Sequence, residues 1–270
     1  MKILLCTDGS SYTARALDLG VRVARKAASA VDILVVAKRD REEKARQMAE
    51  KAAADLETAG IPVAIHRRSG QMTEEVVLQA QAASYDLVII GGRERRGVMR
   101  LLLGSPALRV TEHVPASVLV VKGQARDLKQ FLVCSSGGPT SERTVRFAGR
   151  LARALGASVI LLHVMSQLPL TKSAVLDDLE ASAEELIRRG SPEGVHLGRM
   201  LDLLATEGRT GHAVIRRGLV RDEILAESRE GQYDLIVIGA HITPGLNARL
   251  VEDLSAAILL TANRPVLVVR

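Results

Sequence analysis

A glycine-rich stretch with several arginines contains the residue types and spacing that most suggest chemistry in this sequence. It runs from Gly91 to Ser105 and reads GGRERRGVMRLLLGS. Glycines let a backbone approach a ligand closely, and the unpaired N–H groups at the start of a helix attract an anion. Arg93 adds a guanidinium that can pair with phosphate oxygens. The stretch is therefore a candidate phosphate-binding loop, with a simple chain-reversing turn as the alternative.

The elements around this loop place it where ligands bind in α/β proteins. An apolar run at 85–90 predicts a buried strand before the loop, and a helix is expected to begin near Ser105. Ligands of open parallel sheets lie beyond the carboxyl ends of the strands. A second polar turn follows the first apolar run, 2–7. In that turn Asp8 either binds a ligand or helps to cap the next helix, for which Ser10 or its neighbour is the expected cap.

Apolar runs alternate with helical patterns through the first half of the chain. The runs predict strands at 2–7, 31–36, 62–66, 85–90 and 117–121. Helices are expected between them, including one at about 41–58 and one that Thr73 would cap. Such alternation predicts an α/β fold with a parallel, doubly wound sheet.

The same order of elements then recurs. Cys6 and Cys134 stand at equivalent places with an offset of 128 residues, whereas the motif at 85–91 returns at 233–239 with an offset of 148. The last valine-rich strand returns at 266–269 with that larger offset. Repetition over this length indicates two copies of one domain.

The change of offset reveals an insertion in the second copy. We expect one domain at 1–123 and another at 129–270, with about 20 extra residues placed within 165–210. Two helices are predicted there, at roughly 173–189 and 195–206. They either cover the cleft of the second domain or form a partner surface.

Composition narrows the class of protein. The net charge of +6 suggests an anionic partner, but aromatics are only 2% and no long basic run occurs, which disfavours nucleic acid. No apolar run is long enough to span a membrane or to serve as a signal peptide, and two cysteines suggest no disulfide framework. A cytoplasmic location is expected. Cys6 and Cys134 are interpreted as small core residues and His163 as a hydrogen-bonded core histidine.

Four pieces of the chain carry a family resemblance by their order and spacing: Leu4–Ser10, Asp86–Gly91, Gly97–Ser105, and the final valine-rich strand of each half. With them, nearly all of both halves resembles a tandem universal stress protein. The resemblance implies, in each half, a five-stranded parallel sheet with helices on both faces, of the adenine nucleotide alpha hydrolase-like type. It also implies pairing through the last strands, within the chain as a pseudo-twofold pair of domains or between chains as a homodimer.

Nucleotide-binding members of that family share a spaced glycine pattern, which is Gly, two residues, Gly, nine residues, Gly, then Ser or Thr. Here the first glycine falls on Gly91, the last on Gly104 and the hydroxyl on Ser105. Glu94 replaces the middle glycine, so a carboxylate stands where the backbone should approach phosphate oxygens.

The resemblance also supplies the rest of the implied nucleotide site. It places Asp8 on the adenosine side and Val36 at the base-binding position. Arg93 lies beside Glu94 and pairs either with that carboxylate or with phosphate. The ligand implied is ATP or a related adenine nucleotide, with magnesium.

The second half keeps little of this pattern. Gly239 matches the first glycine, but Ile242, Glu252 and Asp253 replace the other three pattern residues. Ser136 stands at the position of the first-half aspartate. We therefore expect the second half to be a structural or regulatory partner whose site is lost or repurposed.

Three functions follow from these observations. The leading hypothesis is a stress-response, nucleotide-binding switch or adaptor with its site in the first half. The alternative is a protein-interaction module that binds no nucleotide and acts through an unidentified protein partner, which Glu94 favours. A slow ATPase is the weakest hypothesis, because no Walker lysine, magnesium-binding carboxylate set or nucleophile–base pair is recognisable.

Overall fold

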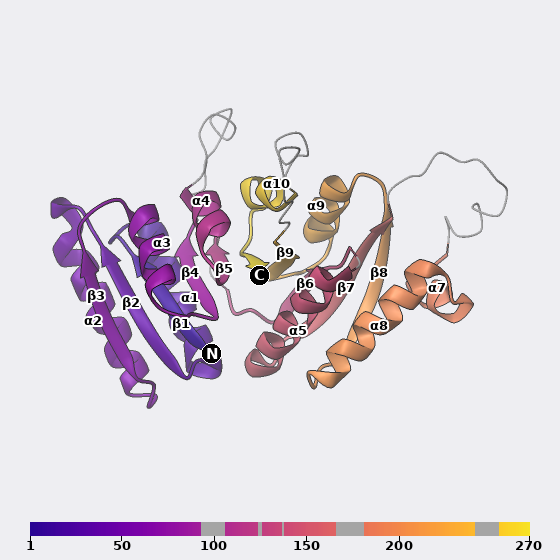
Figure 1. The fold of residues 1–270 in the computed structure, drawn as a ribbon, viewed down its shortest axis with the longest axis horizontal. Coiled ribbons are helices and arrows are strands. Elements are labelled where there is room, and N and C mark those ends of the chain that lie inside the picture. The colour runs from indigo at the N-terminus through magenta and orange to yellow at the C-terminus, as the bar shows by residue number, and fades with distance from the viewer. Residues whose placement is uncertain (93–105, 124–125, 137, 166–180, 241–253) are drawn as a thin grey trace. The chain divides into compact units, whose positions relative to one another are not determined.

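The computed structural model describes residues 1–92, 106–123, 126–136, 138–165, 181–240 and 254–270. The chain divides into two compact units. Figure 1 colours the chain by residue number, from indigo at the N-terminus to yellow at the C-terminus. Unit 1 comprises Met1–Asp127 together with Leu259–Arg270, and unit 2 comprises Leu128–Ile258. The last residues of the second repeat therefore belong to unit 1.

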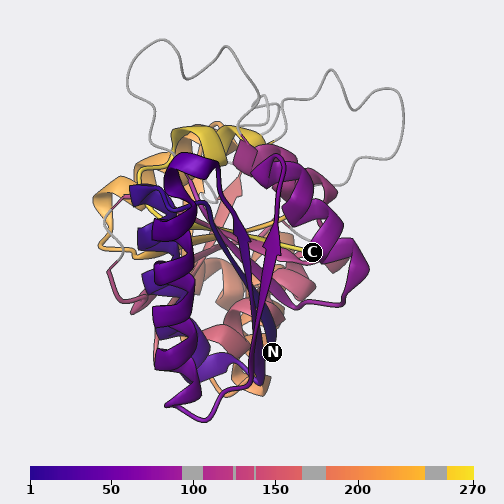
Figure 2. The same ribbon diagram turned by 90° about the vertical axis from the view of Figure 1, so that its left-hand side faces the viewer.

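Unit 1 is a doubly wound α/β structure, as predicted. Its elements from the first repeat are β1 (Lys2–Thr7), α1 (Ser11–Ala27), β2 (Ala30–Val36), a 3-10 turn (Arg39–Arg41), α2 (Glu42–Glu57), β3 (Val63–Arg68), α3 (Met72–Ala82), β4 (Leu87–Gly91), α4 (Pro106–His113) and β5 (Ser117–Val121). These five strands are parallel in the order β3-β2-β1-β4-β5. Helices α1 and α2 pack together on one face and α3 and α4 on the other (Figure 2).

A sixth strand completes the sheet of unit 1. Strand β10 (Val266–Val269) pairs antiparallel with β5, and Val266 lies opposite Val120. It is the final strand of the second repeat, and all four of its residues are buried. The sheet of unit 1 therefore has six described strands rather than the five expected of one repeat.

Unit 2 repeats the pattern without that last strand. Its elements are β6 (Gln130–Cys134), α5 (Gly138–Leu155), β7 (Ser158–Met165), α7 (Ala183–Arg189), α8 (Pro192–Thr206), β8 (Gly211–Arg217), α9 (Val220–Glu230), β9 (Leu235–Gly239) and the start of α10 (Leu254–Thr261). The strands are parallel in the order β9-β6-β7-β8. Strand β10 is absent from this set because it belongs to unit 1.

The insertion in the second repeat forms α7 and α8. Gly190 ends α7 in the left-handed region at φ +70°, and Ser191 caps α8 by accepting a hydrogen bond from the Gly194 amide at 3.1 Å. A Cβ at Gly194 would lie 2.0 Å from the Leu186 carbonyl oxygen, so this glycine lets the two helices meet. The predicted helix at 173–189 is confirmed only in its last part, because 166–180 lies outside the described residues.

The start of α3 differs from the prediction. The helix begins at Met72 and its N-cap is Gln71, with no side-chain cap hydrogen bond. Thr73 is thus inside the first turn and does not cap the helix. A threonine next to two glutamates resembles a helix start, but the turn before it, where Gly70 has φ +143°, sets the boundary earlier.

Each unit buries one tyrosine whose hydroxyl donates to a carboxylate. In unit 1, Tyr85 donates to Asp32 Oδ2 at 2.5 Å and accepts from Gln79 Nε2 at 2.9 Å. Burial, followed by the nearby Asp32 carboxylate, raises the pKa of Tyr85 to about 12. Arg68 completes the group by donating to Gln79 Oε1 at 2.8 Å.

In unit 2 the buried tyrosine also donates to a carboxylate, but this carboxylate lies on helix α9. Tyr233 donates to Glu227 Oε1 at 2.5 Å, and Arg216 donates to Glu227 Oε2 at 2.6 Å. Glu227 is the counterpart of Gln79, while the counterpart of Asp32 is the apolar Ile160. Each repeat therefore places one carboxylate against its tyrosine, on a strand in unit 1 and on a helix in unit 2.

This exchange predicts a compensating pair of substitutions in unit 1. Gln79→Glu should destabilise the chain by about 1–3 kcal/mol, because two carboxylates then share one tyrosine hydroxyl. Adding Asp32→Asn should recover most of that loss, because Arg68 can then hold the new glutamate as Arg216 holds Glu227. Urea unfolding of the two single variants and the double variant measures the coupling. Strictly additive losses would contradict this account.

Candidate functional site

The turn after β1 is organised by the Asp8 carboxylate. Asp8 Oδ1 accepts from the Ser10 amide at 2.9 Å and from Thr13 Oγ1 at 2.8 Å, while Oδ2 accepts from Tyr12 Oη at 3.0 Å. Ser10 is the N-cap of α1, as predicted, and accepts from the Thr13 amide at 3.4 Å. Asp8 thus holds the turn that precedes α1, while the N-cap of the helix is Ser10.

The same contacts fix the charge of Asp8. Burial alone would raise the pKa of its carboxyl, but hydrogen bonds from Ser10, Thr13 and Tyr12 outweigh burial and lower it overall. Asp8 is thus ionised at neutral pH. A carboxylate oxygen can accept more than one hydrogen bond, so an ionised Asp8 can hold the turn and still accept a donor from a ligand.

Gly91 ends β4 beside the start of α1. A Cβ at this position would lie 2.8 Å from the Tyr12 carbonyl oxygen and 3.0 Å from Thr13 Cα. Any side chain here would push β4 away from the Asp8 turn. This glycine therefore keeps the carboxyl end of β4 close to the carboxyl end of β1.

The structure brings three of the predicted site residues to one edge of the sheet. Asp8 follows β1, Val36 ends β2 and Gly91 ends β4, and β1 lies between β2 and β4. Val36 is buried. The other three predicted residues, Arg93, Gly104 and Ser105, lie outside the described residues.

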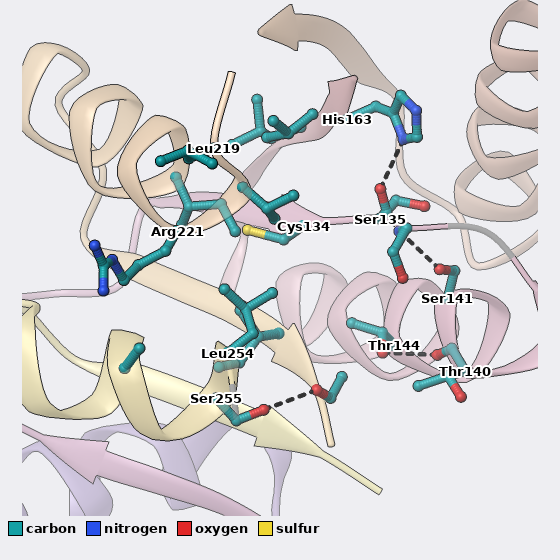
Figure 3. A pocket seen from close by; sticks show the side chains of 18 residues that line it. Cys134, Ser135, Thr140, Ser141, Thr144, His163, Leu219, Arg221, Leu254 and Ser255 are labelled. Carbon is teal, nitrogen blue, oxygen red and sulfur yellow. Dashed lines mark hydrogen bonds between the residues drawn. The ribbon is translucent and has the colours of Figure 1, made fainter. Parts of the chain in front are cut away.

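Unit 2 has a cavity of about 510 Å³ at the corresponding edge (Figure 3). It is bordered by the ends of β6, β7 and β9 and by α5, α9 and α10. Among its lining residues are Ser136, Val164 and Gly239, which are the repeat counterparts of Asp8, Val36 and Gly91. The cavity therefore occupies in unit 2 the place that the sequence predicts for the ligand in unit 1.

Gly239 plays the same packing role as Gly91. A Cβ there would lie 2.7 Å from Thr140 Cγ2 and 2.8 Å from Thr144 Oγ1, both on α5. The glycine at the end of the fourth strand thus permits close contact with the first helix in both units.

A pair of histidines flanks the cavity at Ser135. His163 Nδ1 lies 2.9 Å from the Ser135 carbonyl oxygen, and because a carbonyl only accepts, Nδ1 carries the proton. Figure 3 shows this hydrogen bond. His196 Nε2 on α8 lies 2.7 Å from Ser135 Oγ, and the two imidazole centroids are 5.6 Å apart. His163 is hydrogen-bonded, as predicted, but it is half-buried and lines the cavity instead of lying in the core.

The Ser135–His196 contact joins the inserted helix to β6 and was not predicted. Burial, then the proximity of His163 and Arg199, lowers the pKa of His196. Serine beside histidine can be a nucleophile and base, but the Ser135 amide donates to Leu162 O at 2.9 Å and the Ser136 amide to Ser141 Oγ at 3.0 Å. These adjacent amides are therefore engaged and form no oxyanion hole.

Cys6 is a buried packing residue, as predicted, whereas Cys134 is half-buried and lines the cavity. Burial raises the pKa of the Cys134 thiol to about 12 and raises that of Cys6 as well. Both thiols are thus protonated at neutral pH, which is opposite to what a redox-active cysteine needs. The described residues contain no group of three or more His, Cys, Asp or Glu placed to hold a metal ion.

Comparison with models of protein families shows which family of α/β proteins the chain belongs to. The model of the universal stress protein family matches residues 1–122 and again residues 128–270. The chain belongs to the universal stress protein family. The two matches confirm the tandem arrangement inferred from the repeats.

Curated relatives and solved structures agree with this assignment. A universal stress protein of Mycolicibacterium smegmatis is 26% identical over 245 residues, covering 85% of this chain and 78% of that protein. The crystal structure of a universal stress protein from Archaeoglobus fulgidus DSM 4304 has a TM-score of 0.71 at 19% identity, covering 100% of this chain and 98% of that one. A putative universal stress protein from Pseudomonas aeruginosa UCBPP-PA14 has a TM-score of 0.70 at 18% identity, covering 99% and 92%. The structures support the universal stress protein fold.

The described part of this universal stress protein includes no helix that is both long and apolar enough to cross a membrane.

The close approach at Gly91 predicts a steric penalty. Gly91→Ala should destabilise the chain by about 1–3 kcal/mol, because its Cβ meets backbone atoms of α1 that cannot move independently. Gly198→Ala on α8 is the matched control, since its Cβ would lie 3.9 Å from Ile187 Cγ2 and alanine favours a helix. Urea unfolding should show a loss for the first variant and none for the second. Equal effects would refute the packing role.

The half-buried His196 predicts a pH dependence of stability. Its folded pKa lies below the unfolded value of 6.5, so the unfolded chain binds the proton more readily and the free energy of unfolding should fall from pH 7.5 to pH 5.5. The facing charged or titratable groups are His163, Arg199 and Glu142, which pairs with Arg199 at 2.6 Å.

His196→Gln should reduce this pH dependence because the glutamine does not titrate. His113→Gln, which changes an exposed histidine of α4, should keep the wild-type dependence. Urea unfolding at pH 7.5 and 5.5 compares the three proteins. Identical pH dependences in wild type and His196→Gln would exclude His196 as the cause.

Proposed function

We propose that this universal stress protein binds an adenine nucleotide of the ATP type at the carboxyl edge of the unit 1 sheet, and acts as a nucleotide-dependent switch or adaptor in the stress response. The observation that supports this most is the convergence of Asp8, Val36 and Gly91 at the ends of β1, β2 and β4, respectively. The chain winds outward from β1 to β2 and then returns to β4 on the other side. A ligand site is favoured at such a switch point.

Each of the three residues offers a distinct part of the recognition. Asp8 presents an ionised carboxylate that accepts hydroxyl donors on the adenosine side. Val36 places a buried apolar side chain at the position proposed for the base. Gly91 lets the following loop start close to the Asp8 turn, so that Arg93, Gly104 and Ser105 can reach the phosphates.

Magnesium would enter this site with the nucleotide. The Asp8 oxygens already accept three hydrogen bonds from the turn, and the described residues provide no ready-made group of metal ligands. Mg²⁺ is commonly held by substrate phosphates and water with few protein ligands. The described edge is compatible with that mode of binding.

A protein-interaction module without nucleotide is the second candidate. Glu94 favours it, because a carboxylate in the loop opposes an approaching phosphate. Hydrolysis of ATP has less support, since the one serine–histidine contact discussed above lies in unit 2 and its adjacent amides are engaged.

Calorimetric titration with ATP and magnesium tests the site with a matched pair of variants. Val36→Phe fills the proposed base position in unit 1, and Val164→Phe makes the same change in unit 2. The wild type should bind one equivalent, Val36→Phe should bind at least about ten-fold more weakly because the base is excluded, and Val164→Phe should bind as wild type. Thermal melts of each variant establish that it is folded.

Two substitutions in the loop separate the remaining outcomes. Gly104→Asp should abolish binding, because it adds a carboxylate at the phosphate position. If the wild type shows no ATP binding but Glu94→Gly binds ATP, the Glu94 carboxylate prevents binding and the interaction module is favoured. Loss of binding in Val164→Phe but not in Val36→Phe would place the site in unit 2. If none of the proteins shows a heat of ATP binding, nucleotide binding is refuted.

A further inference from the structure

The cavity of unit 2 differs in chemistry from the nucleotide site proposed for unit 1. One side of it is apolar, with Leu219, Val220 and Ile224 of α9 near Ile238 of β9 and Leu254 of α10. Leu219 is 72% exposed at the rim, whereas Ile224 is buried. In Figure 3, Leu219 lies at the upper left and Leu254 lies below it beside Ser255, whereas Ser135, Ser141 and Thr144 lie to the right.

Two hydroxyl groups that line the cavity are engaged as donors. Thr144 Oγ1 donates to the Thr140 carbonyl oxygen at 2.8 Å, and Ser255 Oγ donates to the Gly239 carbonyl oxygen at 3.3 Å (Figure 3). Because a hydroxyl has one proton and two lone pairs, the Thr144 oxygen can still act as an acceptor. It therefore suits a ligand that brings its own hydrogen-bond donor.

Permanent charge is scarce around this cavity. Of its described lining residues, Arg221 alone is always charged, and its Nε pairs with the adjacent Asp222 at 2.9 Å. Ser136 replaces the aspartate of the first repeat, so the described lining has no carboxylate for a ribose. Burial of an unpaired charge is costly, and this lining offers little to compensate an anion.

We propose that this cavity is a second, independent site, which binds a small uncharged molecule with an apolar ring body and a hydroxyl or N–H donor. Its volume of about 510 Å³ lies within the range of small-molecule sites. The apolar side contacts the ring, and the Thr144 oxygen accepts the donor. The site goes beyond the nucleotide function of unit 1 and does not depend on it.

Three naphthalene derivatives isolate the features of this ligand. 2-Naphthol is uncharged at pH 7 and carries a donor, naphthalene lacks the donor, and 2-naphthalenesulfonate is an anion of the same ring size. All three fluoresce, and the chain has no tryptophan to interfere. Fluorescence titration of the full chain should show saturable binding of one equivalent of 2-naphthol, about five-fold weaker binding of naphthalene, and the weakest binding of the sulfonate.

Two variants locate the bound probe. Thr144→Val keeps the shape of a buried side chain and removes its oxygen, so it should weaken 2-naphthol about five-fold and leave naphthalene unchanged. Thr111→Val is the matched control, because Thr111 is also buried and donates to a helix carbonyl, Leu108 O at 2.7 Å, but lies in unit 1. Val164→Phe should fill the cavity and weaken both neutral probes.

The outcomes separate this site from the nucleotide site. Saturating ATP should leave 2-naphthol binding unchanged, and 2-naphthol should bind even if ATP does not. Absence of saturable 2-naphthol binding would overturn the proposal, as would tighter binding of the sulfonate, competition by ATP, or equal effects of Thr144→Val and Thr111→Val. The Thr144→Val result decides the matter even if Val164→Phe does not fold.

Discussion

The contact between the end of the fourth strand and the start of the first helix constrains the rest of each unit. At Gly91 and again at Gly239 a single added carbon would meet atoms of that helix within 3 Å. Because the glycine admits this contact, the turn after the first strand and the end of the fourth strand share one edge of the sheet. Both the predicted site of unit 1 and the observed cavity of unit 2 lie at that edge.

On this shared backbone the two repeats carry different chemistry. Asp8 is an ionised carboxylate held by three donors, whereas its counterpart Ser136 is neutral and lines a cavity with a largely apolar side. The tyrosine–carboxylate pairs show the same freedom in the interior, since the acid is Asp32 in unit 1 and Glu227 in unit 2. Each unit therefore keeps a carboxylate against its buried tyrosine, but the carboxylate comes from a strand in unit 1 and from a helix in unit 2.

The sequence predicted what depends on local pattern. Apolar runs predicted the strands, the repeat offset predicted two domains, and the resemblance placed Asp8, Val36 and Gly91 at one edge. It did not predict the contact between Ser135 and His196, because the two residues are 61 positions apart and His196 lies in an insertion without a counterpart in the first repeat. The cavity of unit 2 was not predicted for a related reason. A cavity depends on how side chains from several elements pack, and these elements are far apart in the sequence.

Strand β10 belongs to the sheet of unit 1 although the whole second repeat separates it from β5 in the sequence. During synthesis, β5 is therefore complete long before its antiparallel neighbour exists. At ordinary translation rates this interval is on the order of ten seconds, during which β5 is an open sheet edge made of Ser117 and four successive aliphatic residues. Unit 1 thus has a nascent form that differs from its final one, with an edge that can pair wrongly with other strands. Correct folding of unit 1 therefore requires that β5 avoid mispairing until β10 has been synthesised.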